Sequence, residues 1–138
     1  MFTRKLLVVA AVLAPLAAHG ASLTINPGMW ETTMTRTNPM TGTPTTETST
    51  ECVTEQSFDP REMMQDAQGC QLTEENLSGD TLTFAMACTV EGAGSADIKG
   101  RFQTDGQTGN GAMNMSMNMG GMTMSMDMNW TARRLGDC

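Results

Sequence analysis

Methionine is the residue type whose abundance and spacing in this chain could support a chemical role such as metal binding. Eight of its fifteen methionines occupy every second position from Met113 to Met128, with one interruption at 120–121. Thioether sulfur is a soft ligand that suits monovalent ions such as Cu(I) and Ag(I). Methionine is also a flexible apolar residue that fills irregular gaps in a core. This methionine-rich stretch is therefore compatible with a metal site and with an apolar surface.

The glycine pair Gly120–Gly121 predicts how these methionines are arranged. Two glycines between alternating segments favour the primed two-residue turn of a β-hairpin. All eight methionines then share one face of the hairpin, and the other face carries only Asn, Ser, Thr and Asp. The directly opposed pairs on this methionine face are Met113 and Met128, Met115 and Met126, Met117 and Met124, and Met119 and Met122.

Four interpretations of the methionine face follow. We favour a role as core, because the chain has few aromatic residues and a buried Met side chain contributes roughly 1.5–3 kcal/mol. The second interpretation is a Cu(I) or Ag(I) site in which the eight thioethers are the candidate ligands. A third is a cavity for an apolar ligand, and a fourth is an oxidant sink, since thioethers oxidise reversibly. The sequence leaves the last three open.

The four cysteines, Cys52, Cys70, Cys88 and Cys138, predict two disulfides, because an even number in a small exported chain is typical of structural bridges. No C-x-x-C pair is present, so neither a zinc site nor a thioredoxin-like motif is indicated. In a strict meander a three-residue loop would place Cys70 directly opposite Cys88. This favours Cys70–Cys88 with Cys52–Cys138, and Cys52–Cys70 with Cys88–Cys138 stays as the alternative.

Residues 1–20 have the pattern of a secretory signal peptide, with a basic start, an apolar run and small residues before a cleavage site after Gly20. We therefore expect a periplasmic or secreted protein without a membrane span after cleavage, in which residues 21–138 form a single disulfide-stapled β domain. Loss of Arg4 and Lys5 would leave six basic and fifteen acidic residues, a net charge of −9. Such a charge disfavours nucleic acid as a partner. The partner is otherwise unknown, an apolar ligand or a soft metal ion being the candidates.

The residues left after cleavage offer little for catalysis. His19, the one histidine, lies in the predicted signal peptide, and Lys99 is the one lysine beyond it. Nucleophilic triads and most catalytic zinc sites need imidazole. Glu74 and Glu75 are adjacent, so a strand would direct them to opposite faces. We therefore expect no enzyme, no catalytic residues and no cofactor, apart from Cu(I) in the alternative interpretation.

Short alternating segments between turn residues predict a mainly β fold. The clearest is 81–90, in which Leu82, Phe84 and Met86 share one face, while the polar, threonine-rich segment 45–53 suits a sheet edge. About seven such strands indicate an antiparallel meander curled into a barrel or half-barrel. One short helix is predicted near 60–68, with Asp59 as N-cap, Pro60 at the first helical position and Gly69 as the stop.

Four stretches carry a family resemblance: Pro27-Gly28-Met29-Trp30-Glu31, Cys52-Val53-Thr54, Gly69-Cys70, and the C-terminal Arg133-Arg134-Leu135-Gly136-Asp137-Cys138. In this order they resemble the bacterial exported proteins grouped as a domain of unknown function, family 3617. The resemblance implies a periplasmic or secreted β-domain with paired cysteines, and it supplies no activity. The methionine hairpin is denser here than the family pattern.

These observations together predict a small exported β-domain that acts as a binding or envelope-structure module, with the methionine hairpin as core or ligand face. The alternative is a periplasmic Cu(I)/Ag(I)-binding protein that uses the face between Met113 and Met128.

Overall fold

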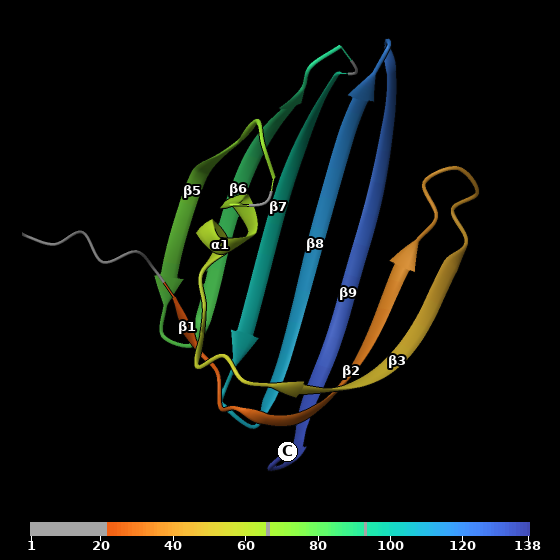
Figure 1. Ribbon diagram of the computed structural model, residues 1–138. Coiled ribbons are helices and arrows are strands. Elements are labelled where there is room, and N and C mark those ends of the chain that lie inside the picture. The colour runs from red at the N-terminus through yellow and green to blue at the C-terminus, as the bar shows by residue number, and fades with distance from the viewer. Residues whose placement is uncertain (1–21, 66, 93) are drawn as a thin grey trace, which may run out of the picture.

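The computed structural model describes residues 22–65, 67–92 and 94–138, so the predicted signal peptide lies outside the described residues. One antiparallel seven-stranded sheet dominates it, with strand order β3-β2-β9-β8-β7-β6-β5 (Figure 1). A two-stranded ribbon and one short helix accompany the sheet. The elements are β1 (Leu23–Thr24), β2 (Gly28–Thr37), β3 (Pro44–Val53), β4 (Ser57–Phe58), α1 (Pro60–Gln65), β5 (Cys70–Ser78), β6 (Thr81–Val90), β7 (Gly94–Thr104), β8 (Thr108–Met119) and β9 (Met122–Gly136).

The sheet curls but does not close, because β3 and β5 are its two edges and do not pair with each other in the described part of the chain. The predicted mainly β half-barrel is therefore confirmed, with β3 at an edge as expected. One connection departs from a strict meander. After β3 the chain crosses in front of the sheet through β4 and α1 to reach β5 (Figure 1), while β2 pairs with β9.

Aromatic rings on the inner face form the centre of the core. The ring of Phe102 lies 4.4 Å from Phe58, 5.6 Å from Phe84 and 4.7 Å from Trp130, measured between ring centroids. Phe58 comes from the β1–β4 ribbon, which thus covers one end of the curled sheet. Leu82, Phe84 and Met86 of β6 are buried together, as the alternation of that segment predicts.

The β5–β6 hairpin has the predicted disulfide, but its strand register differs from the predicted one. The expected three-residue loop is wrong, because Ser78 pairs directly with Thr81 and leaves a turn of two residues. A β-bulge after Leu72 adds one residue to β5. Cys70 therefore still lies opposite Cys88, and the two form a disulfide.

Helix α1 begins as predicted and ends sooner. Asp59 caps it by accepting a hydrogen bond from the backbone N–H of Arg61 at 2.9 Å. The helix ends at Gln65 rather than near 68. By Gly69 the chain has reached the sheet, where the Gly69 carbonyl accepts a hydrogen bond from the backbone N–H of Thr89. The sequence predicts partial burial of Met63 and Met64 on this helix. Met64 is half-buried, and the side chain of Met63 lies outside the described residues.

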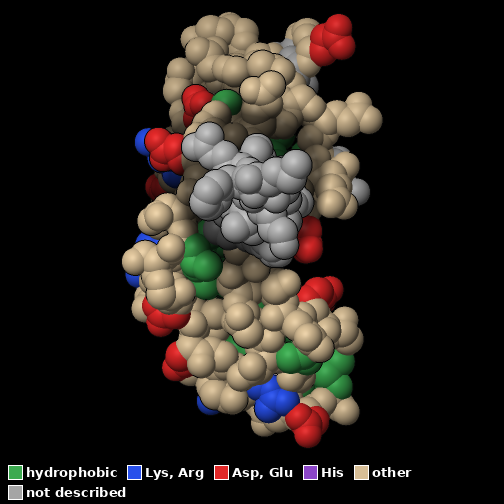
Figure 2. Space-filling model, turned by 90° about the vertical axis from the view of Figure 1, so that its left-hand side faces the viewer, with side chains coloured by type: hydrophobic (Ala, Val, Ile, Leu, Met, Phe, Trp, Pro, Cys, Tyr) green, Lys and Arg blue, Asp and Glu red, His purple; other side chains and the backbone are tan. Residues whose placement is uncertain are grey.

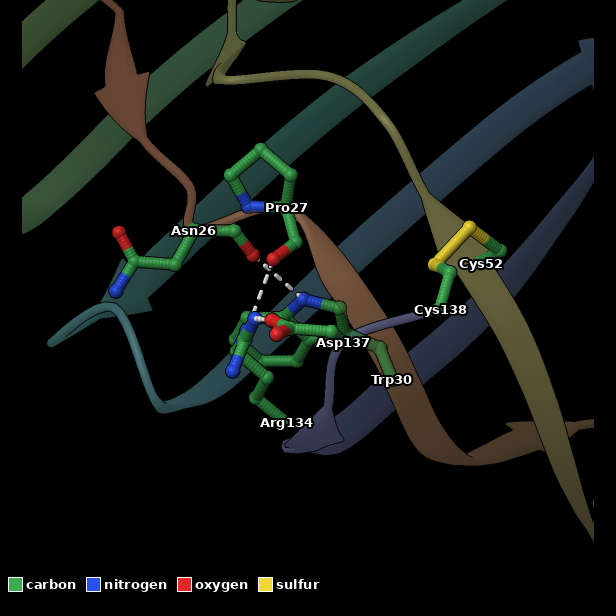
Figure 3. Close-up of a disulfide and its surroundings, with 7 residues drawn as sticks. All are labelled: Asn26, Pro27, Trp30, Cys52, Arg134, Asp137 and Cys138. Carbon is green, nitrogen blue, oxygen red and sulfur yellow. Dashed lines mark hydrogen bonds and ion pairs between the residues drawn. A yellow bond between two sulfur atoms is a disulfide. The ribbon is translucent and has the colours of Figure 1, made fainter.

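The second disulfide, Cys52–Cys138, ties the end of β3 to the tail that follows β9, which confirms the favoured pairing. Figure 3 shows Arg134 next to Pro27 and Asp137, close to the chain that leads to this disulfide. The Nε atom of Arg134 donates to the carbonyl of Pro27 at 2.9 Å, and the guanidinium also pairs with Asp137. The disulfide thus fixes the C-terminal tail to β3, and the hydrogen bond from Arg134 fixes the end of β9 to the residue before β2.

The side of the molecule that carries β5 is largely polar. Figure 2 views the molecule from the side of β5, where the visible acidic groups are scattered and hydrophobic groups form only small separate areas. Among the described residues, the helix is too short to cross a membrane.

Candidate ligand-binding face

The concave side of the sheet contains a cavity of about 410 Å³. It lies between the β1–β4 ribbon and the inner faces of the sheet strands β2, β7, β8 and β9, and it opens to solvent. Most of its surface is apolar, with a few polar side chains at its border. The lining residues are Leu23, Ile25, Trp30, Thr32, Met34, Val53, Phe58, Phe102, Gln103, Thr104, Gly109, Asn110, Met113, Met128, Trp130 and Ala132.

Both tryptophans of the chain border this cavity. Trp30 is buried, and its indole N–H donates to the carbonyl of Asn26 at 2.8 Å. Trp130 is only half-buried, because one side of its ring faces the open cavity. The sequence predicts that both indoles belong to the core, because Trp30 shares a strand face with Met34 and Trp130 continues the methionine face. This prediction is right for Trp30 and only partly right for Trp130.

A glycine opposite each large ring leaves space for the inner-face aromatics. Phe84 pairs with Gly100 across β6 and β7, and Trp130 pairs with Gly111 across β8 and β9. A Cβ atom on Gly100 would lie 2.3 Å from the Phe84 ring, and one on Gly111 would lie 2.2 Å from the Trp130 ring. Both rings therefore lie flat over backbone that only glycine provides.

The methionine face has the predicted register. Met119 pairs with Met122 across the Gly120–Gly121 turn, and the pairing continues without a shift to Met113 opposite Met128. On the reverse face Asn114 donates to the carboxylate of Asp127 at 2.7 Å. All eight methionines thus lie on the same side of the hairpin as Trp130, and the apolar surface continues from the cavity to the hairpin tip.

The structure supports the favoured interpretation of this face as core only in part, since six of the eight methionines are half-buried. None of the eight methionines is buried, and Met119 and Met122 at the tip are 43% and 66% exposed. For the β9 methionines the strand pairing adds to this exposure, since β2 meets β9 only from Gly136 to Met128. Residues 122–127 of β9 therefore have β8 on one side and no second neighbour among the described strands.

The donors available to a metal on this face are thioethers alone. All four cysteines are joined in disulfides. No group of three or more His, Cys, Asp or Glu side chains in the described ranges is placed to hold a metal ion. Lys99 lies on the outer face, because its neighbour Ile98 pairs with Met115 on the inner face. The charged groups of β7 are thus kept away from the methionines.

Sequence reasoning missed the contribution of Phe58 and Leu23 to the cavity. They lie on strands of two residues each, which are too short to show a periodic pattern. Phe102 had a detectable signature, because Ile98, Gly100 and Phe102 alternate on one face of β7.

Fold and site together define a disulfide-stapled, curled antiparallel sheet with an open apolar concave face. The chain belongs to the family of proteins of unknown function designated DUF3617, whose family model matches residues 25–138. This match confirms the resemblance seen in the sequence motifs. Comparisons with curated proteins and with solved structures give no match.

Proposed function

We propose that this protein is a periplasmic or secreted binding module that holds an apolar ligand in the concave cavity and has no catalytic role. The cavity carries the proposal. Its volume of about 410 Å³ falls within the range of small-molecule sites, roughly 300–1,000 Å³. The two disulfides fit an oxidising compartment.

The chemistry of the lining indicates the class of ligand. Phe102 and Trp130 present aromatic surface, and Met34, Met113 and Met128 add flexible side chains that adapt to different shapes. A charged group would lose its hydration there without a buried partner, which is costly. The ligand we propose is therefore a hydrocarbon chain or ring, with any polar end directed to solvent.

A fluorescence titration tests this proposal. The apolar dye N-phenyl-1-naphthylamine should gain emission on binding and quench the tryptophans, since both of them border the cavity. Met34→Lys places a charge in the cavity and should weaken dye binding roughly tenfold or more. Thr33→Lys is the matched control, because Thr33 lies on the opposite face of the same strand, beside Thr48. Equal affinity of both variants for the dye would contradict the proposal.

A second candidate function is the binding of Cu(I) or Ag(I) by the methionine face. The observation that favours it is the unbroken register from Met113–Met128 to Met119–Met122, which leaves four opposed thioether pairs accessible to solvent. Soft monovalent ions prefer such ligands. Calorimetric titration of the disulfide-intact protein with Ag(I) in chloride-free buffer tests it, and an absence of saturable heat would refute it.

A further inference from the structure

We infer that the middle of the methionine face is a binding site for one soft monovalent cation, Cu(I) or Ag(I), with the thioethers of Met115, Met117, Met124 and Met126 as its ligands. This inference rests on the second candidate function and narrows it from a face of eight methionines to one set of four. The two pairs Met115–Met126 and Met117–Met124 are consecutive same-face pairs of the β8–β9 ladder.

The strand geometry brings these four sulfur atoms within reach of one ion. Opposed Cβ atoms in an antiparallel pair lie about 4.5–5.5 Å apart, and same-face neighbours along a strand about 7 Å apart. A point above the centre of this rectangle is therefore only ~4–5 Å from each Cβ. A methionine sulfur lies two bonds beyond Cβ on a flexible chain, so all four can turn inward to a shared ion.

Exposure separates this set from the two methionines at the tip, and position separates it from the two at the cavity. Met119 and Met122 are exposed at the tip, where water competes for a bound ion. Met113 and Met128 line the aromatic cavity at the other end. The four between are half-buried, which leaves an entry path and still shields an ion from water.

The surroundings of the set leave space and offer no rival ligand. On the β7 side Met115 is opposed by Ile98 and Met117 by the small Ala96. On the other side β9 has no further strand beyond Met126 among the described residues, so its side chains can move. Met124 and Met126 can therefore turn inward without displacing a neighbouring strand.

Packing alone does not account for the choice of methionine here. Strands favour β-branched and aromatic residues, and methionine is used chiefly to fill gaps inside a core. These side chains fill no closed core, yet each inward position of the hairpin between 113 and 128 is methionine. A soft-ion site explains both the residue type and its accessibility.

A ligand set of thioethers alone also predicts that the affinity for Ag(I) does not depend on pH. Thiolate and imidazole sites lose affinity in acid because their ligands take up protons. Thioethers do not titrate, so Ag(I) affinity should stay constant from pH 8 to pH 4 over the range where the protein remains folded. A marked fall in affinity across this range would overturn the inference.

The decisive experiment is a titration of the disulfide-intact protein with Ag(I) in nitrate buffer, followed by NMR of ¹³C-labelled methionine methyl groups. At one equivalent we expect saturating shifts at Met115, Met117, Met124 and Met126. Replacing these four by leucine should abolish binding, and the control Met113→Leu with Met128→Leu should retain it. Methionine-to-leucine changes roughly conserve volume, so both variants should fold.

The possible outcomes distinguish a failure of the proposed four-methionine site from a failure of the second candidate function, soft-metal binding. Shifts confined to the tip or to the cavity pair, or binding that survives the fourfold leucine change, overturn this site and leave the second candidate function standing. No saturable Ag(I) binding by the unaltered protein overturns both. The methyl map of the unaltered protein decides the question even where a variant fails to fold.

Discussion

Replacing Gly111 by alanine should destabilise the protein through one identified clash. The new Cβ atom would lie 2.2 Å from Cζ2 and 2.3 Å from Cε2 of the Trp130 ring. The indole must then move, and it cannot move freely because its centroid lies 4.7 Å from that of Phe102. Forcing an extra carbon into such packing typically costs about 1–3 kcal/mol of unfolding free energy.

Gly109 provides a matched control on the same face of the same strand. A Cβ atom there would meet nothing closer than the carbonyl oxygen of Gln103 at 3.4 Å. Alanine at that position should leave the native state unstrained and stabilise it by about 0.4–1 kcal/mol through the unfolded state. Both variants share this unfolded-state gain, so they should differ by the cost of the clash, roughly 1–3 kcal/mol.

Urea unfolding, followed by tryptophan fluorescence and far-ultraviolet circular dichroism, measures this difference. With a denaturant dependence of about 1–3 kcal/mol per molar, the midpoint of Gly111→Ala should fall roughly 1 M below that of Gly109→Ala. Gly111→Ala should also weaken binding of the apolar dye, because the displaced Trp130 borders the cavity. Equal midpoints for the two variants would refute the idea that Gly111 exists to seat the indole.

Three further predictions concern the staples and turns. Cys52→Ser with Cys138→Ser removes a link across 86 residues and should lower the unfolding free energy by about 4–5 kcal/mol on the chain-entropy estimate, measured in urea. Arg134→Ala should release the C-terminal tail, so that dithiothreitol reduces the Cys52–Cys138 bridge faster than in the unaltered protein; an unchanged rate would count against this. The backbone N–H of Thr108, and a second backbone N–H of the same turn, lower the pKa of Asp105 below its ordinary value. The ionised Asp105 carboxylate therefore stabilises the fold above the ordinary carboxyl pKa, and this stabilisation is lost as the pH falls through the lowered pKa. NMR titration of the carboxyl carbon measures this pKa. A normal or raised pKa of Asp105 would disprove the prediction.

The hairpin register was predictable because two local rules agree. Gly120–Gly121 demands a tight turn, and strict alternation on both sides fixes which residues share a face. The helix start was predictable for a similar reason, since Asp59 and Pro60 act on backbone groups within a few residues. Such features depend on neighbours in sequence, where residue types carry the information directly.

The cavity was not predictable, because it depends on contacts between distant segments. Phe58 reaches Phe102 only because β4 pairs with β1, and Trp30 faces the cavity only because β2 pairs with β9. The exposure of the methionine face was missed for the same reason. Alternation shows that Met124 and Met126 share a face, but not whether another layer covers it.

An uncovered apolar face leaves the protein with little buried surface, and the disulfides offset this. By the chain-entropy estimate the bridges of 18 and 86 residues contribute about 3 and 4.5 kcal/mol. Each burial of a large apolar side chain contributes about 1.5–3 kcal/mol, so the two bridges replace roughly three to five such burials. Cys52–Cys138 also holds the β2–β3 hairpin against β9, which keeps Met34 beside Trp130. The staples thus stabilise a sheet whose concave face stays accessible, and that accessibility is what both proposed binding functions require.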